Sequence, residues 1–156
     1  TPELLGGGLP ERLAADADVA SRFGVRYGWN AELLRWRLGF PGTALTISEH
    51  PRFWVVSTVR KAAGIPVVAL LKVWARERSD RPIRLGPSAV ASLARAHRTP
   101  AVIHVGLNAD VSMVGTPLPK RIRPAPLFLT YVANPEIVAT EEINFDTFEL
   151  LDFDAL

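Results

Sequence analysis

Residues 81–97, RPIRLGPSAVASLARAH, have the layout of an anion-binding turn: an extended stretch, a Gly-Pro turn and the start of an alanine-rich helix. The N–H groups in the first turn of a helix, aided by the helix dipole, hold phosphate groups in many cofactor sites. Here the turn has a single glycine, Gly86, and the next residue, Pro87, has no N–H to donate. Two interpretations stay open. One is a weakened phosphate site made by the amides of Ser88 and Ala89, and the other is an ordinary helix start.

Other polar residues each have a simple alternative to a catalytic role. Glu49 and His50 form either a polar pair near a substrate or a solvated turn. Asp152 and Asp154 would face the same way on a strand, as a carboxylate pair or, as we expect, as a solvated edge. The three histidines have no spacing typical of a metal site, and no serine lies in a glycine-flanked nucleophile turn. We therefore expect no bound metal.

The composition is that of one globular domain. The chain has 156 residues, of which 48% are hydrophobic and 22% charged, so it can bury a core. It has no cysteine, which excludes disulfides and thiolate sites and favours a cytoplasmic location. No apolar run approaches the roughly 18 residues of a membrane span, and the start lacks the pattern of a signal peptide.

The charge is distributed unevenly along the chain. The last 21 residues hold seven of the 16 acidic residues and none of the 18 basic ones, so the remainder is basic. Such asymmetry can indicate a nucleic-acid partner. Apart from KRIR at 120–123, however, the basic residues are scattered. The pattern therefore favours a modest anionic ligand or a solvated face over nucleic acid.

The hydrophobic periodicity predicts two helices followed by a three-stranded meander. The helices cover about 10–24 and 30–38, the second capped by Asn30 and ended by Gly39 at C′. Strands are expected at 43–49, 52–60 and 65–76, joined by short turns that favour antiparallel pairing. The third strand is apolar on both faces, so it should be central and covered on both sides.

The second half of the chain predicts a crossover and further strands. A helix over 87–98 should connect the meander to a parallel strand at 101–107. Strands follow at 126–132 and at the end of the chain, where a bulge near 150–151 explains a switch of the apolar face. The predicted fold class is α+β, with a central, mostly antiparallel mixed sheet of about six strands and helices packed on its faces.

This order of elements resembles the GNAT superfamily of acyl-CoA-dependent N-acyltransferases. The resemblance covers residues 10–156, and ELLRWRLGFP at 32–41 is similar to the L-x-W-R-aromatic helix end of a divergent GNAT-like branch. The family's first strand would lie before Thr1. The resemblance therefore implies a single GNAT-like domain over 1–156, as a fragment or as the C-terminal domain of a longer protein.

The resemblance also implies a site for coenzyme A. The family's pyrophosphate loop has the pattern Q/R-x-x-G-x-G/A. RPIRLGPSA places Arg81 or Arg84 at its basic position, Gly86 at one glycine, and Ser88 or Ala89 at the last small position. Trp74 ends the central strand where the family's backbone pairs with the pantetheine arm. The implied cofactor is acetyl-CoA or another acyl-CoA.

Two residues are the implied catalytic candidates. His104 lies on the strand that separates from the meander in the family, where a neutral imidazole could act as a base. The alternative is a hydrogen-bonded core histidine. Tyr131 would protonate the leaving thiolate, although it lies in a strand rather than in the family's usual helix, and it could equally be an ordinary strand aromatic.

Two functions follow from these observations, and the enzymatic assignment stays open between them. The first is an N-acyltransferase that moves an acyl group from acyl-CoA to a small-molecule or peptide amine. The alternative is a non-catalytic GNAT-like structural or substrate-binding domain of a larger protein. A sheet without its first strand has an exposed edge, which a homodimer partner or an upstream domain could cover.

Overall fold

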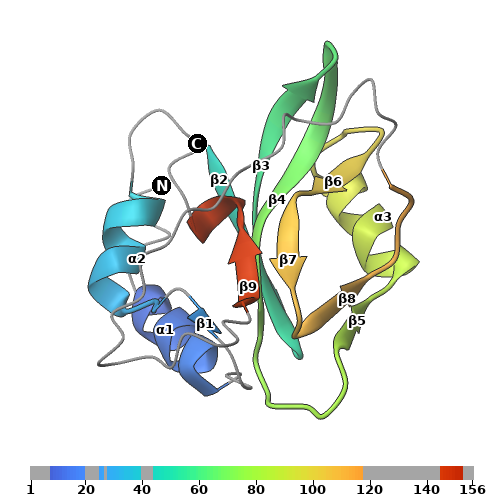
Figure 1. Ribbon diagram of the computed structural model, residues 1–156. Coiled ribbons are helices and arrows are strands. Elements are labelled where there is room, and N and C mark those ends of the chain that lie inside the picture. The colour runs from blue at the N-terminus through green and yellow to red at the C-terminus, as the bar shows by residue number, and fades with distance from the viewer. Residues whose placement is uncertain (1–7, 20–24, 27, 40–43, 118–144, 153–156) are drawn as a thin grey trace.

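The computed structural model describes residues 8–19, 25–26, 28–39, 44–117 and 145–152. The predicted strand at 126–132, with the candidate Tyr131, lies outside the described residues, as do KRIR at 120–123 and Asp154. The described chain is α+β, as predicted, with three α-helices and a mixed four-stranded sheet at its centre (Figure 1).

The central sheet has the strand order β2-β3-β4-β6. Its strands are β2 (Leu45–His50), β3 (Phe53–Ala62), β4 (Ile65–Ala75) and β6 (Val102–His104). The first three pair antiparallel, and β6 pairs parallel with β4, which confirms the predicted meander and crossover. Gly64 has a φ of 83° in the β3–β4 turn, which explains a glycine there.

The helices cover both faces of this sheet. They are α1 (Leu9–Val19), α2 (Ala31–Leu38) and α3 (Pro87–Ala96), and in Figure 1 the first two lie on one side of β2–β4 and α3 on the other. The side chain of Asn30 accepts a 2.8 Å hydrogen bond from the N–H of Leu33, so the predicted N-cap is confirmed. Gly39 follows the last helical residue with a right-handed φ of −83°, in place of the left-handed C′ residue we expected. No described helix is long and apolar enough to cross a membrane.

Two hydrophobic cores lie on opposite faces of β4, as its doubly apolar sequence predicts. Leu71 and Trp74 belong to the core under α1 and α2, whereas Leu70 and Val73 belong to the core under α3. A strand buried on both faces is fixed in register by two sets of contacts, so β4 is the element on which the other elements are positioned.

Alternation along β4 is interrupted once. Lys72 pairs with Val56 and Leu70 pairs with Ser57, so Leu71 is the extra residue of a β-bulge. If β4 alternated regularly, with no bulge, the side chain of Lys72 would point to the same face as that of Leu70, into the apolar core under α3. The bulge instead turns Leu71 and Lys72 to the face that α1 and α2 cover.

The remaining strands depart from the expected sheet. The stretch 101–107 is split, and β7 (Gly106–Asn108) leaves β4 to pair antiparallel with β9 (Phe145–Glu149), which also pairs with β1 (Val25–Arg26). A separate pair joins β5 (Ile83–Leu85) to β8 (Val111–Met113). The described strands thus form sheets of four, three and two strands, and a single sheet of about six is not confirmed. The bulge predicted at 150–151 is a 3-10 turn, η3 (Leu150–Asp152).

The split at Gly106 has a steric requirement. Its φ is 128°, and a Cβ there would lie only 2.2 Å from the carbonyl oxygen of Phe148 and 2.8 Å from the Cα of Glu149. Glycine at this position therefore lets β7 and β9 approach.

We predict that Gly106→Ala destabilises the chain by about 2 kcal/mol or more, because the new methyl group must push β9 away from β7. Urea denaturation followed by circular dichroism measures the free energy of unfolding. Gly115→Ala is the matched control, since a Cβ there meets nothing within 4 Å. Equal stability of the two variants would show that the close approach of β7 and β9 is not required.

Candidate functional site

A buried cluster of charges joins β4 to the end of the chain. Lys72 Nζ lies 2.5 Å from Asp152 Oδ2 and 3.3 Å from Glu149 Oε2. The Lys72 side chain is only 2% exposed and the two carboxylates are fully buried. Burying charges is costly unless they are paired and hydrogen-bonded, so the value of this cluster depends on how completely its groups are satisfied.

Glu149 is satisfied on both oxygens. Oε2 accepts hydrogen bonds from the N–H of Val73 (3.3 Å) and the side-chain amide of Asn108 (3.0 Å), in addition to Lys72. Oε1 lies 2.9 Å from Nε2 of His104. With partners on both oxygens, this buried carboxylate is fully hydrogen-bonded.

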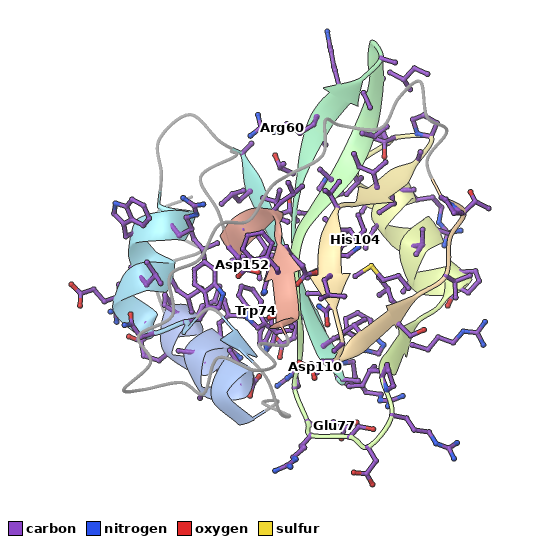
Figure 2. The ribbon with its side chains drawn as sticks, viewed as in Figure 1. Arg60, Trp74, Glu77, His104, Asp110 and Asp152 are labelled. Carbon is purple, nitrogen blue, oxygen red and sulfur yellow. The ribbon has the colours of Figure 1, made fainter. Side chains whose placement is uncertain are left out.

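Asp152 is held in the same way by the geometry of η3. Its Oδ2 accepts the backbone N–H of Glu149 at 2.7 Å as well as Lys72, and its Oδ1 accepts the indole N–H of Trp29 at 2.9 Å. Figure 2 shows Asp152 and His104 on opposite sides of the closing strand β9. Glu149 contacts Lys72 with one carboxylate oxygen and His104 with the other.

His104, the predicted base, stands where β4 and β6 part. Their pairing ends at Leu70–His104, after which β4 continues to Ala75 paired with β3 but no longer with β6. The histidine side chain is 20% exposed, and its Nε2 faces Glu149, so in the neutral tautomer that donates to the carboxylate Nδ1 is the acceptor. The structure therefore places a carboxylate–histidine pair at this position.

The gap between β4 and β7 is filled by side chains of the protein. Asn108 Nδ2 donates to the carbonyl oxygen of Val73 at 2.9 Å, while Glu149 accepts the N–H of the same residue. Both backbone groups of Val73 are therefore already hydrogen-bonded to side chains. A ligand that paired with β4 here would have to displace Asn108 and Glu149.

The side chain of Trp74, the predicted pantetheine contact, lies on the face of the sheet that α1 and α2 cover. It is 5% exposed, belongs to the core under α1 and α2, and packs edge-on against Trp29 with ring centroids 5.8 Å apart. Its indole Nε1 is buried without a hydrogen-bond partner among the described residues. The structure does not bring Trp74 together with the predicted phosphate loop.

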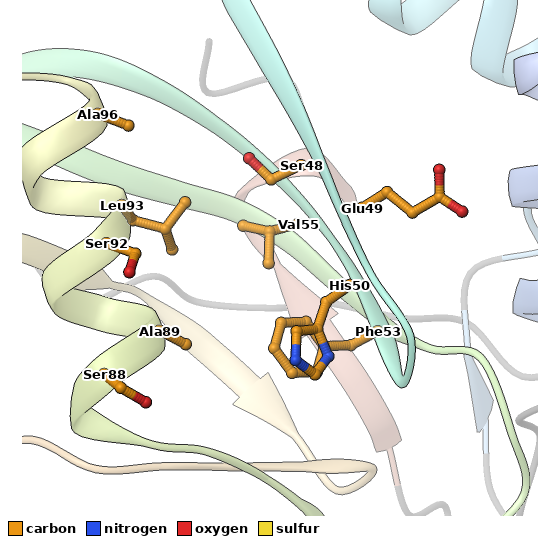
Figure 3. Close-up of a pocket in the computed structure, with 10 residues that line it drawn as sticks. All are labelled: Ser48, Glu49, His50, Phe53, Val55, Ser88, Ala89, Ser92, Leu93 and Ala96. Carbon is orange, nitrogen blue, oxygen red and sulfur yellow. The ribbon is translucent and has the colours of Figure 1, made fainter.

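The predicted loop residues lie at the start of α3, on the other face. Gly86 is the N-cap and Pro87 the first helical residue, as expected, while Arg84 is exposed on β5. Ser88 and Ala89 line a pocket of about 390 Å³ between α3 and strands β2 and β3 (Figure 3). His50 lines the same pocket, so the structure brings it together with two of the predicted loop residues.

The sequence pattern did not identify several residues of the buried cluster as candidates. Lys72 is the one charged residue of the apolar stretch 65–75, and that was the available signal. The expectation that Asp152 lies on a solvated edge is wrong, because η3 turns its carboxylate into the core beside Lys72. Among the described residues, no group of three or more His, Asp or Glu side chains is arranged to hold a metal ion.

We predict that Lys72→Met destabilises the chain by about 3–5 kcal/mol, because it leaves two buried carboxylates without their cation. Arg52→Met is the matched control. Arg52 pairs with Glu77 at 3.1 Å, but both side chains are more than half exposed, so its loss should cost at most about 1 kcal/mol. Urea unfolding of both variants checks this, and similar losses in the two would contradict the special weight of the buried cluster.

Comparison of the chain with protein-family models, curated proteins and solved structures finds no match. The function must therefore be argued from the residues of the site. The two features that bear on it are the filled gap beside β4 and the open pocket beside α3.

Proposed function

We propose that this chain is a GNAT-like binding domain in which the position of the acyl-CoA arm is occupied by the protein itself, so that the domain binds a ligand without transferring an acyl group. The observation that carries the proposal is that both backbone groups of Val73 are hydrogen-bonded to side chains of the protein. Its N–H and carbonyl groups are bonded to Glu149 and Asn108 at 3.3 and 2.9 Å. These are the backbone groups of β4 that an acyl-CoA arm would need.

The cost of opening the gap supports this proposal. Glu149 cannot leave Val73 without weakening its contacts to Lys72 and His104 as well. Breaking a buried ion pair costs about 3–5 kcal/mol when one partner is left uncompensated. An incoming ligand would have to supply that free energy in addition to its own desolvation.

One observation favours a second candidate, the N-acyltransferase. His104 and Glu149 form the pair that general-base catalysis uses, with a buried carboxylate that orients a partly exposed imidazole. In that mechanism Nδ1 of His104 would accept the proton of the attacking amine, and acetyl-CoA or another acyl-CoA would be the donor. The two candidates differ in whether coenzyme A binds at all.

Thermal denaturation in the presence of 100 µM to 2 mM coenzyme A or acetyl-CoA separates them. A ligand present at 100 times its Kd stabilises the folded state by about 2.7 kcal/mol, which raises the Tm of a domain of this size by about 5 °C or more. The binding domain we propose shows no such increase. It also releases no thiol from acetyl-CoA when spermidine or a lysine-containing peptide is supplied.

Asn108→Ala serves as the matched variant, because it frees the carbonyl of Val73 and removes one hydrogen bond to Glu149, while the ion pairs of Lys72 with Glu149 and Asp152 stay in place. We expect any stabilisation by coenzyme A to appear first in this variant. A clear Tm increase in the unmodified chain, together with thiol release that His104→Ala abolishes, would overturn the proposal and establish the acyltransferase.

A further inference from the structure

The pocket beside α3 is an open cavity of the described surface. It lies between α3 and the edge of the sheet, where β2 and β3 run past the helix, and its volume is about 390 Å³ (Figure 3). Volumes of this order are typical of small-molecule sites. Its apolar lining comes from both sides, with Phe53 and Val55 from β3 and Leu93 from α3.

Apart from Glu49, the polar side chains that line the pocket carry no formal charge. Three hydroxyls line it, those of Ser48, Ser88 and Ser92. Among the described lining residues, Glu49 alone has a formally charged group, and Figure 3 shows its carboxylate pointing away from α3. There it pairs with Arg76 at 2.9 Å. The described lining residues therefore offer a charged ligand no unpaired countercharge in return for the water it loses, which is unfavourable.

His50 supplies a fixed, flat surface at one end of the pocket. Its ring stacks on Phe53 with centroids 4.2 Å apart and an interplanar angle of 13°. Nδ1 accepts a hydrogen bond from the N–H of Arg52 at 3.2 Å, so the neutral ring has its proton on Nε2. The pocket therefore presents aromatic surface together with N–H and O–H groups.

We infer that this pocket binds a neutral small molecule with a flat apolar body and a carbonyl or hydroxyl oxygen. The body packs on Phe53, Val55 and Leu93, and the oxygen accepts hydrogen bonds from His50 and the serine hydroxyls. This inference rests on the proposed function, because it names the ligand class of the binding domain. It uses strands β2 and β3 and helix α3, whereas the filled gap lies along the backbone of β4 at Val73.

Three probes of one shape test the ligand class: benzamide is neutral, benzoate is an anion and benzylammonium is a cation. Each is titrated into the ¹⁵N-labelled full chain at pH 7, and the amide chemical shifts are followed by NMR. We expect benzamide to shift the amides of Ser48, His50, Ser88 and Ser92 in a saturable way. Both charged probes should bind at least about fivefold more weakly than benzamide, because they lose hydration without gaining a countercharge.

Two variants of α3 locate the binding. Ser92→Phe fills the pocket, whereas Ala91→Phe adds the same side chain at an exposed neighbour that does not line it. Benzamide binding should be lost in Ser92→Phe and retained in Ala91→Phe. Unchanged binding in Ser92→Phe, or no saturable shifts with any probe, would overturn the inference. Tighter binding of benzoate would also overturn it, in favour of an anion held at the first turn of α3.

Coenzyme A titrated into the same samples keeps this inference separate from the proposed function. Shifts at Val73 and Asn108 with coenzyme A would contradict the filled gap and leave the benzamide result to stand by itself. If neither benzamide nor coenzyme A shifted any amide, the proposed ligand class would be wrong, whereas the filled gap at Val73 would still stand.

Discussion

The buried ion cluster of Lys72, Glu149 and Asp152 is the constraint on which the rest of this structure depends. The Nζ of Lys72 on β4 lies 3.3 Å from the carboxylate of Glu149 on β9 and 2.5 Å from that of Asp152 in η3. All three side chains are almost fully removed from water. Such a cluster contributes little net stability compared with apolar packing, but it permits few alternatives, because displacing one member leaves the others unpaired. It therefore fixes where the end of the chain packs against the central strand.

The same cluster also occupies the place where β4 and β6 part. Glu149 faces Lys72 with one oxygen and His104 with the other, and together with Asn108 it satisfies both backbone groups of Val73. The gap that opens where β4 and β6 part is thereby filled. At the other edge of the central sheet, formed by β2, an open pocket lies between α3 and strands β2 and β3.

The sequence was sufficient for the central elements and insufficient for the outer strands and the cluster. Periodicity predicted the three meander strands, the crossover helix and the parallel pairing of β4 with β6, because each follows from local apolar patterns. The bulge at Leu71 has no such pattern, and without it Lys72 would be assigned to the wrong face. Likewise Asp152 belongs to an acidic tail that looks solvated, and only the turn η3 directs it inward. Long-range pairing of charges depends on tertiary register, which a single sequence does not encode locally.

The most direct test of the account is a crystal structure of the chain grown with 5 mM coenzyme A. The account predicts that Asn108 and Glu149 remain bonded to Val73 and that no pantetheine density lies between β4 and β7. A pantetheine arm hydrogen-bonded to Val73, with Asn108 and Glu149 turned away, would contradict it.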